Sequence, residues 1–262
     1  MVAILVGIFL ITPTVIVVVM SFSTGATLHF PPPGLGLHWY RNFFADQEWR
    51  ASAVTSIKVG TAAAAIATVL GTLTALGLVR GRYPGKGLIT AIVLSPLIVP
   101  WIVVAVGMYL VFSSWHLTGT YLGFVVAHAS LGIPFVVVNV ATALRRLDTN
   151  LELAAQNLGA GPLRVFWRVT LPLIVPSIVA GALLAFVTSW DEVIIAIFLS
   201  SPLTRTLPVV MWNQVQANQD PTIAAVSTML TALTVVIVIA TTLFIGWQNR
   251  LRRAPAAGRA AG

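Results

Sequence analysis

Six long apolar runs constrain this chain more than any other feature of its sequence. A helix needs about 20 apolar residues to cross the hydrocarbon core of a bilayer, and each run reaches that length. Charged residues make up only 8% of the chain, whereas about 25% is usual in soluble domains. We therefore predict one all-α membrane domain covering residues 1–262. The predicted spans are residues 2–22, 53–79, 88–113, 120–144, 173–199 and 222–248.

The first run is predicted to be a membrane span and not a cleaved signal peptide. No basic residue precedes it, and it is longer than the roughly 7–15 residues of a signal-peptide apolar region. The third run contains Pro96 and Pro100, which predict a bent helix because proline removes a backbone hydrogen bond. The fourth contains His128 and Asn139, and each is expected to hydrogen-bond to a neighbouring helix rather than to bind a metal ion.

The segments between the runs are more polar. Residues 37–44 place aromatic side chains at helical spacing, which predicts a short helix at the membrane interface. The rest of segment 23–52 and the Pro-rich segment 200–221 are expected to be loops on the outer side. The basic tail from Asn249 onward is predicted to be disordered.

The distribution of Lys and Arg predicts the orientation of the chain. A net charge of +8 would suit nucleic-acid binding in a soluble protein, but in a membrane protein such an excess is typical of cytoplasmic loops. Three of these residues lie in segment 80–87, four in segment 145–172 and four in the tail, so eleven of fifteen fall on one side if six spans alternate. We therefore expect both termini and loop 145–172 in the cytoplasm, and no nucleic-acid partner.

Loop 145–172 has the signals of two short helices joined by a glycine turn. Thr149 and Glu152 have the spacing of a capping box, so the first helix is predicted to start at about Asn150. Two glycines suited to a left-handed helix end follow, and then a proline suited to the first turn of a second helix. These turn residues are Gly159, Gly161 and Pro162.

The same loop resembles the EAA loop of the permease subunits of bacterial ABC importers. The family pattern is a Glu-Ala-Ala run, roughly three residues, a Gly, and about a dozen residues before a Leu-Pro pair. In this sequence Leu153 separates the Glu from the Ala pair, while the spacing from the Ala pair to the Gly is kept. The alternative is an ordinary amphipathic hairpin. The matching residues are Glu152, Ala154, Ala155, Gly159, Leu171 and Pro172.

The sequence contains no ATP-binding signature and no recognisable setting for a catalytic triad or a carboxylate pair. We therefore expect a non-catalytic transport subunit without a cofactor of its own. The resemblance implies that two partner ATPase subunits bind ATP and magnesium, and that loop 145–172 docks on one of them as a coupling helix. Glu152 is expected to cap the loop and to pair with an Arg. The residues assigned to coupling are Glu152, Ala154, Ala155 and Gly159.

Trp190, Asp191 and Glu192 form a second candidate site, in the fifth predicted span. A charge at the bilayer centre costs about 2.5–3.5 kcal/mol, so two adjacent carboxylates are not expected to face lipid. In one interpretation they guide a cationic solute along a pathway. In the other they mark a helix break near the outer surface, with carboxylates bound to backbone or to Arg205. The sequence leaves both open.

Residues 186–208 resemble spermidine/putrescine permeases in particular, because an acidic pair is followed by a Pro-containing turn and a Leu-Pro pair. The resemblance implies a type I ABC importer transmembrane domain (MetI-like) in the bacterial inner membrane, forming half of a pathway for a polyamine or similar cation. It also implies a second, homologous permease and an extracytoplasmic binding protein. Opines, phosphonates and ferric iron are alternative solutes within the family.

Two interpretations from other classes stay open. An ion-gradient-driven secondary transporter or channel would use Asp191 and Glu192, although such folds usually show inverted repeats and the sequence has no convincing repeat. A membrane scaffold that docks a cytoplasmic partner would transport nothing.

Overall fold

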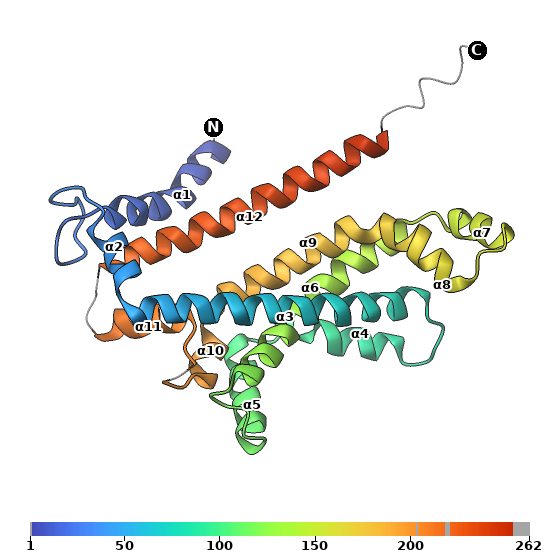
Figure 1. Ribbon diagram of the computed structural model, residues 1–262, viewed down its shortest axis with the longest axis horizontal. Helices are drawn as coiled ribbons and strands as arrows, with labels where there is room; N and C mark the ends of the chain where they lie inside the picture. The colour runs from blue at the N-terminus through green and yellow to red at the C-terminus, as the bar shows by residue number, and fades with distance from the viewer. Residues whose placement is uncertain (1, 203, 218–220, 254–262) are drawn as a thin grey trace, which may run out of the picture.

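The computed structural model describes residues 2–202, 204–217 and 221–253. In this part of the chain all named secondary-structure elements are helices (Figure 1). The α-helices are α1 (Val2–Ser21), α2 (His38–Ala45), α3 (Gln47–Arg80), α4 (Lys86–Leu94), α5 (Trp101–Ser114), α6 (Tyr121–Arg146), α7 (Thr149–Asn157), α8 (Pro162–Val165), α9 (Leu171–Trp190), α10 (Ile194–Leu199), α11 (Leu207–Ala217) and α12 (Thr222–Arg253). A 3₁₀ turn, η1 (Ser95–Leu97), follows α4, and a π-helical turn, η2 (Phe166–Thr170), precedes α9.

Among the described residues, five helices are long and apolar enough to cross a membrane, or six if one bent pair counts as a span. The five stretches are Ile4–Ser21, Gln47–Arg80, Tyr121–Arg146, Pro162–Trp190 and Thr222–Leu243. The bent pair is Lys86–Leu97 and Trp101–Ser114, with an angle of 104° between its halves. The bend predicted from Pro96 and Pro100 is therefore confirmed, and it is a break between two helices rather than a kink in one.

Helices α3, α6 and α9 pack against one another at the centre of the molecule. Val136 of α6 lies between Gly71 of α3 and Gly181 of α9. A Cβ atom at Gly71 would lie 2.7 Å from the Val136 Cβ, and one at Gly181 would lie 2.8 Å from the Val136 Cα. Small residues allow this close approach, as they do between helices in membranes. The buried apolar cluster here comprises Ala64, Ala67, Ala75, Val136, Val140, Leu144, Ile174 and Ala185.

The remaining helices surround this three-helix core. Along one side α1 packs against α12, and α2 contacts both α12 and α3 (Figure 1). On another side α5, α6, α10 and α11 share a second buried apolar cluster with α3. The short helix predicted at residues 37–44 is confirmed as α2, and its location at the membrane interface stays a prediction.

Several element boundaries differ from the prediction. Helix α3 begins at Gln47, because the Asp46 carboxylate caps it by accepting the N–H groups of Glu48 and Trp49. The predicted outer loop 200–221 contains the helix α11. The N–H of its first residue, Leu207, donates to Ser56 Oγ at 2.7 Å. Helix α12 runs beyond the predicted start of the tail to Arg253. The disorder predicted for 254–262 and the loop positions 203 and 218–220 lie outside the described residues.

Two loops that are far apart in the sequence lie at the same end of the core. The turn between α3 and α4 is at this end, together with α7 and α8 (Figure 1). Helices α2 and α11 lie at the opposite end of α3. This arrangement brings the last residue of α3 next to α7.

Candidate functional site

The first helix of loop 145–172 is capped by Asp148. Its carboxylate accepts the N–H of Asn150 at 2.9 Å, and α7 follows from Thr149 to Asn157. An acidic side chain at this position satisfies one of the free N–H groups of the first helical turn. The predicted capping box of Thr149 and Glu152 is therefore wrong, because the Glu152 carboxylate binds outside its own helix.

Glu152 connects α7 to two other elements. Its Oε1 accepts hydrogen bonds from Arg80 Nη2 at 2.8 Å and from Thr170 Oγ1 at 2.6 Å, and its Oε2 pairs with Arg80 Nη1. The expected Arg partner is thus the last residue of α3. Burial raises the pKa of the Glu152 carboxyl group, but the hydrogen bonds from Arg80 and Thr170 and the Arg80 charge together outweigh burial and hold the pKa below its ordinary value.

The glycine turn after α7 follows the prediction only in part. Gly159 is left-handed, with φ of +83°, as predicted. Gly161 has φ of −66°, so the left-handed conformation predicted for it is wrong. Pro162 begins the second helix, as predicted, but that helix is not short, because α8, η2 and α9 continue without a gap to Trp190. The second half of the loop is the start of a long helix.

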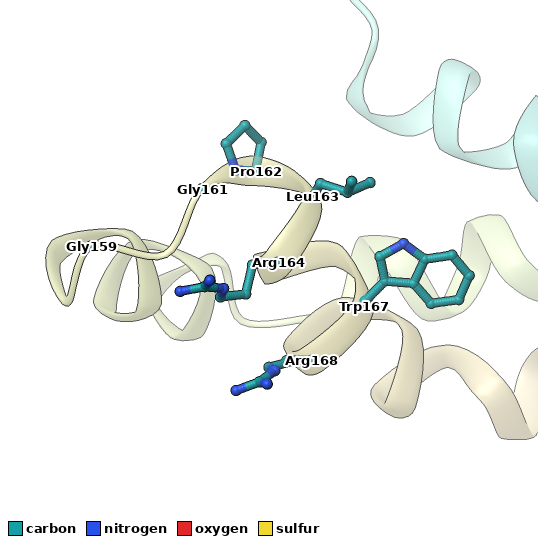
Figure 2. A pocket seen from close by; sticks show the side chains of 7 residues that line it. All are labelled: Gly159, Gly161, Pro162, Leu163, Arg164, Trp167 and Arg168. Atoms are coloured by element: carbon teal, nitrogen blue, oxygen red, sulfur yellow. The ribbon is translucent and has the colours of Figure 1, made fainter.

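The surface of this loop presents apolar side chains. Leu153 is 52% exposed and Leu158 is 89% exposed, while Ala154 is exposed and Ala155 is half-buried. Beyond the turn there is an open hollow of about 590 Å³, which Figure 2 shows with Leu163 and Trp167 on one side of the helix and two arginines on the other. Its lining residues are Gly159, Gly161, Pro162, Leu163, Arg164, Trp167 and Arg168.

The fifth predicted span is interrupted at the acidic pair. Helix α9 ends at Trp190, and α10 begins at Ile194. Glu192 is fully buried, and its two carboxylate oxygens accept the N–H groups of Ile195 at 2.7 Å and Ala196 at 2.8 Å. The helix break with a backbone-bound carboxylate, one of the two interpretations of the sequence, is therefore confirmed for Glu192.

His128 lies beside this break. Its Nδ1 is 2.7 Å from Ser189 Oγ, and its Nε2 is 3.7 Å from Glu192 Oε2. His128 of α6 thus bonds to α9, as predicted for an interhelical hydrogen bond. The same prediction is wrong for Asn139, whose side-chain amide donates to the Phe135 carbonyl of its own helix at 2.8 Å.

Asp191 has different surroundings from Glu192. It is exposed and lines two adjoining hollows beside α11 and α12, with volumes of about 410 and 350 Å³. Trp212 lines one of them, and Ser227 lines both. Arg205, considered from the sequence as a carboxylate partner for the acidic pair, instead donates to Glu48 at 2.8 Å.

The three residues of this second candidate site therefore do not share one cavity. Trp190 is buried, stacks on Phe186 with ring centroids 5.8 Å apart, and lines an apolar hollow of about 330 Å³. Glu192 is enclosed by backbone and His128. Of the three side chains, only Asp191 offers a carboxylate to an open hollow.

Residues 67–254 match the model of a protein family described as "Binding-protein-dependent transport system inner membrane component". The chain belongs to this family. It is the permease subunit of an ABC importer. The match runs from within α3 to the end of α12 and contains all residues of both candidate sites.

Two curated relatives are similar to this permease over most of its length. The putrescine transport system permease protein PotI of Escherichia coli (strain K12) is 33% identical over 229 residues, which cover 85% of this chain and 81% of PotI. The spermidine/putrescine transport system permease protein PotC of the same strain is 31% identical over 238 residues, which cover 90% of this chain and 89% of PotC.

Solved structures share the fold of this permease. A bacterial ABC transporter involved in the import of alginate matches with a TM-score of 0.74 at 18% identity, over 92% of this chain and 94% of that chain. The inward-facing MetNI methionine ABC transporter matches with a TM-score of 0.63 at 18% identity, over 76% of this chain and 97% of that chain. The predicted type I importer fold is therefore confirmed.

Arg80 and Thr170 are the residues of the loop site that the sequence did not single out. Arg80 is one of several basic residues in a short loop, and Thr170 stands just before the Leu-Pro pair. One signal was available for Arg80: it directly follows a predicted span, at the end predicted to lie on the same side of the membrane as Glu152. No comparable signal marks Thr170, whose position depends on the π-helical turn.

Proposed function

We propose that this permease forms half of the translocation pathway of an importer for a polyamine or a similar small cation. Its similarity to PotI and PotC carries the proposal, because their names specify putrescine and spermidine/putrescine transport and the alignments cover 85% and 90% of this chain. Opines, phosphonates and ferric iron are the alternative solutes that an experiment has to separate.

The surroundings of Asp191 support a cationic solute. Its carboxylate lines two adjoining hollows, and the indole of Trp212 lines one of them. A carboxylate attracts an ammonium group by charge, and an aromatic face attracts it through cation–π interaction. Intramembrane charges usually belong to a solute pathway or to an internal pair. Glu192 is internally bonded, so we assign contact with the solute to Asp191.

The apolar surface of loop 145–172 supports docking of an ATPase subunit. Leu153 of α7 and Leu158, which directly follows this helix, are exposed, and the hollow lined by Leu163 and Trp167 adds a concave surface that also carries two arginines. Eleven of the fifteen Lys and Arg residues lie on the side of this loop if six spans alternate, which supports a cytoplasmic location for the loop and both termini.

One copy of this chain supplies half of a pathway, so the complete importer contains a second, homologous permease. Two ATPase subunits bind the cytoplasmic loops, and an extracytoplasmic binding protein meets segments 23–52 and 200–221. ATP binding closes the ATPase pair, and the loop transmits this movement to the helices as rigid bodies. The pathway then opens outward, accepts the solute, and returns after hydrolysis.

The test is reconstitution of the whole complex. The permease would be co-purified with its ATPase, second permease and binding protein, and ATP-dependent uptake of labelled putrescine and spermidine into liposomes would be measured. Competition with an opine, a phosphonate and a ferric chelate identifies the solute. We expect uptake that requires ATP and binding protein and that only polyamines inhibit.

Three results would contradict the proposal. Uptake driven by an ion gradient without ATP would indicate a secondary transporter. ATPase binding without uptake of any of these solutes would indicate a scaffold. Inhibition of uptake by a phosphonate, an opine or ferric iron, and not by polyamines, would leave the importer but replace its solute.

A further inference from the structure

Glu152 is the only buried residue of α7, a helix that the structure describes in full. The leucines of this helix are not buried: Leu151 is 48% exposed and Leu153 is 52% exposed. Apolar packing therefore contributes little to holding α7 against the rest of the chain. The polar contacts of Glu152 are the buried attachment of this helix.

These contacts use both oxygens of the Glu152 carboxylate. Two N–H groups of Arg80 and the hydroxyl of Thr170 donate to it. A bidentate Arg–carboxylate pair fixes orientation as well as distance, because two parallel hydrogen bonds form. With three donors bound and the residue 9% exposed, the carboxylate has little capacity left for a group on another protein.

The two partners of Glu152 belong to the three-helix core. Arg80 is the last residue of α3, where a cation is also favoured by the helix dipole. Thr170 is the last residue of η2 and leads directly into α9. Helices α3 and α9 are packed together through α6. A displacement of α7 is therefore passed to two core helices at once.

The π-helical turn gives Thr170 its position. In this turn the Leu171 N–H donates to the Phe166 carbonyl, five residues earlier. Such wide turns are rare in helices, and those that occur often lie at functional sites. Pro172 follows directly, and a proline ring clashes with the carbonyl four residues before it in a regular α-helix. The wider turn relieves this clash and sets Thr170 within 2.6 Å of Glu152.

We propose that Arg80, Glu152 and Thr170 form an internal clamp, the loop clamp, that fastens the coupling helix α7 to α3 and α9. Glu152 is then a positioning residue that acts inside this chain, while exposed side chains of the loop contact the ATPase. The clamp transmits movement, and the apolar surface provides docking. This inference rests on the proposed coupling to an ATPase subunit.

The test uses the full reconstituted complex and measures putrescine taken up per ATP hydrolysed. In Glu152→Gln, Arg80→Gln and Thr170→Val we expect the ATPase subunits to co-purify as they do with the unmodified permease. Uptake per ATP should fall about five-fold or more, which is the lower end of typical allosteric couplings. Thr170→Ser retains the hydroxyl and should restore the ratio.

Asp148→Asn provides the matched control. Asp148 is an exposed acid at the start of the same helix, and Asn caps helices as well as Asp does. This variant should keep both ATPase binding and uptake per ATP. The double exchange Glu152→Arg with Arg80→Glu should recover part of the ratio lost in either single variant, because the ion pair is re-formed in reverse.

Two outcomes would overturn the clamp. If Glu152→Gln loses the ATPase subunits while Asp148→Asn keeps them, Glu152 is a docking residue. If the ATPase subunits stay bound and uptake per ATP is unchanged in all three clamp variants, the contacts only stabilise the fold. Failure of the unmodified complex to take up putrescine contradicts the proposed solute instead, and the clamp is then tested with the solute that competition identifies.

Discussion

Asp191 and Glu192 are adjacent in the sequence and differ in every contact that decides their roles. Glu192 is buried and accepts two backbone N–H groups of α10, whereas Asp191 is exposed in a hollow. A buried carboxylate at a helix start satisfies donors that would otherwise have no partner. Our proposal therefore assigns Asp191 to the pathway, whereas Glu192 holds the helix break.

This difference predicts opposite effects of neutralising the two residues. In Glu192→Gln an NH₂ group replaces one of the two oxygens that accept backbone N–H groups of α10. One buried N–H then has no acceptor, so the variant should destabilise the permease by about 1–3 kcal/mol. Asp191→Asn should leave thermal stability unchanged but raise the KM for putrescine uptake, because a charge in the hollow is lost. Thermal unfolding in detergent and uptake assays measure the two effects. Equal losses of uptake with unchanged stability would show that both carboxylates meet the solute.

Glu152 gives the loop a dependence on pH. Its folded-state pKa is lowered, so its ionised form stabilises the folded loop. This stabilisation is complete above the ordinary pKa of about 4.3, and it is lost as the pH falls through the lowered value. The difference in thermal stability between the unmodified permease and Glu152→Gln should therefore be constant at neutral pH and shrink in acid. A difference that grew on acidification would have the wrong sign for this ion pair.

At the scale of elements, the contact of Val136 with two glycines fixes how closely α3, α6 and α9 approach. Gly71→Ala would place a methyl group 2.7 Å from the Val136 Cβ, so one helix has to move. Overpacking of this kind costs about 1–3 kcal/mol. We expect a lower unfolding temperature for the purified permease.

Gly77 is the control within the same helix. A Cβ atom there meets nothing within 4 Å, and alanine is about 1 kcal/mol better than glycine inside a helix. Gly77→Ala should therefore keep or raise the unfolding temperature. Similar losses in both alanine variants would mean that backbone flexibility of α3, and not contact with Val136, sets its stability.

The sequence predicted the long apolar helices well, because a membrane span is a local property of about 20 residues. It offered the helix break after Trp190 only as one of two interpretations, and it did not predict that the second loop helix continues into α9. The first depends on Glu192 meeting N–H groups of α10, beside His128 of another helix. The second depends on Glu152 binding Thr170, a contact that follows only once α3 and α9 are packed.

The sequence predicted which residues form the loop site, but not which hydrogen bonds they make. The Glu, the Ala pair and Gly159 were identified from their spacing, and an Arg partner was expected for Glu152. Which Arg it is could not follow from the sequence, because Arg80 lies 72 positions before Glu152, with α4, α5 and α6 between them. The capping-box prediction was wrong because a bidentate ion pair with an arginine stabilises the Glu152 carboxylate more than a hydrogen bond to its own helix start does.

For the whole molecule, the charge distribution predicts which ends of the helices face the cytoplasm. The sequence contains no cysteine, so a single introduced thiol can be labelled without background. Thr27→Cys should react with a membrane-impermeant maleimide in intact cells, because Thr27 is exposed in the segment between α1 and α2. Pro84→Cys, at the same end of the core as loop 145–172, should react only in inverted membrane vesicles. The reverse pattern would place loop 145–172 outside.

The three residues at the centre of the core share one fixed volume, and this has a consequence for how the sequence can change over time. Gly71 and Gly181 lie on different helices, yet both face the same valine: a Cβ atom at Gly71 would meet the Val136 side chain, and one at Gly181 would meet the Val136 Cα. A larger residue at position 71 is tolerated only if position 136 becomes smaller, whereas no change of side chain at position 136 makes room at position 181. In an alignment of related permeases, positions 71 and 136 should therefore vary together, although they lie on different helices, while position 181 stays glycine.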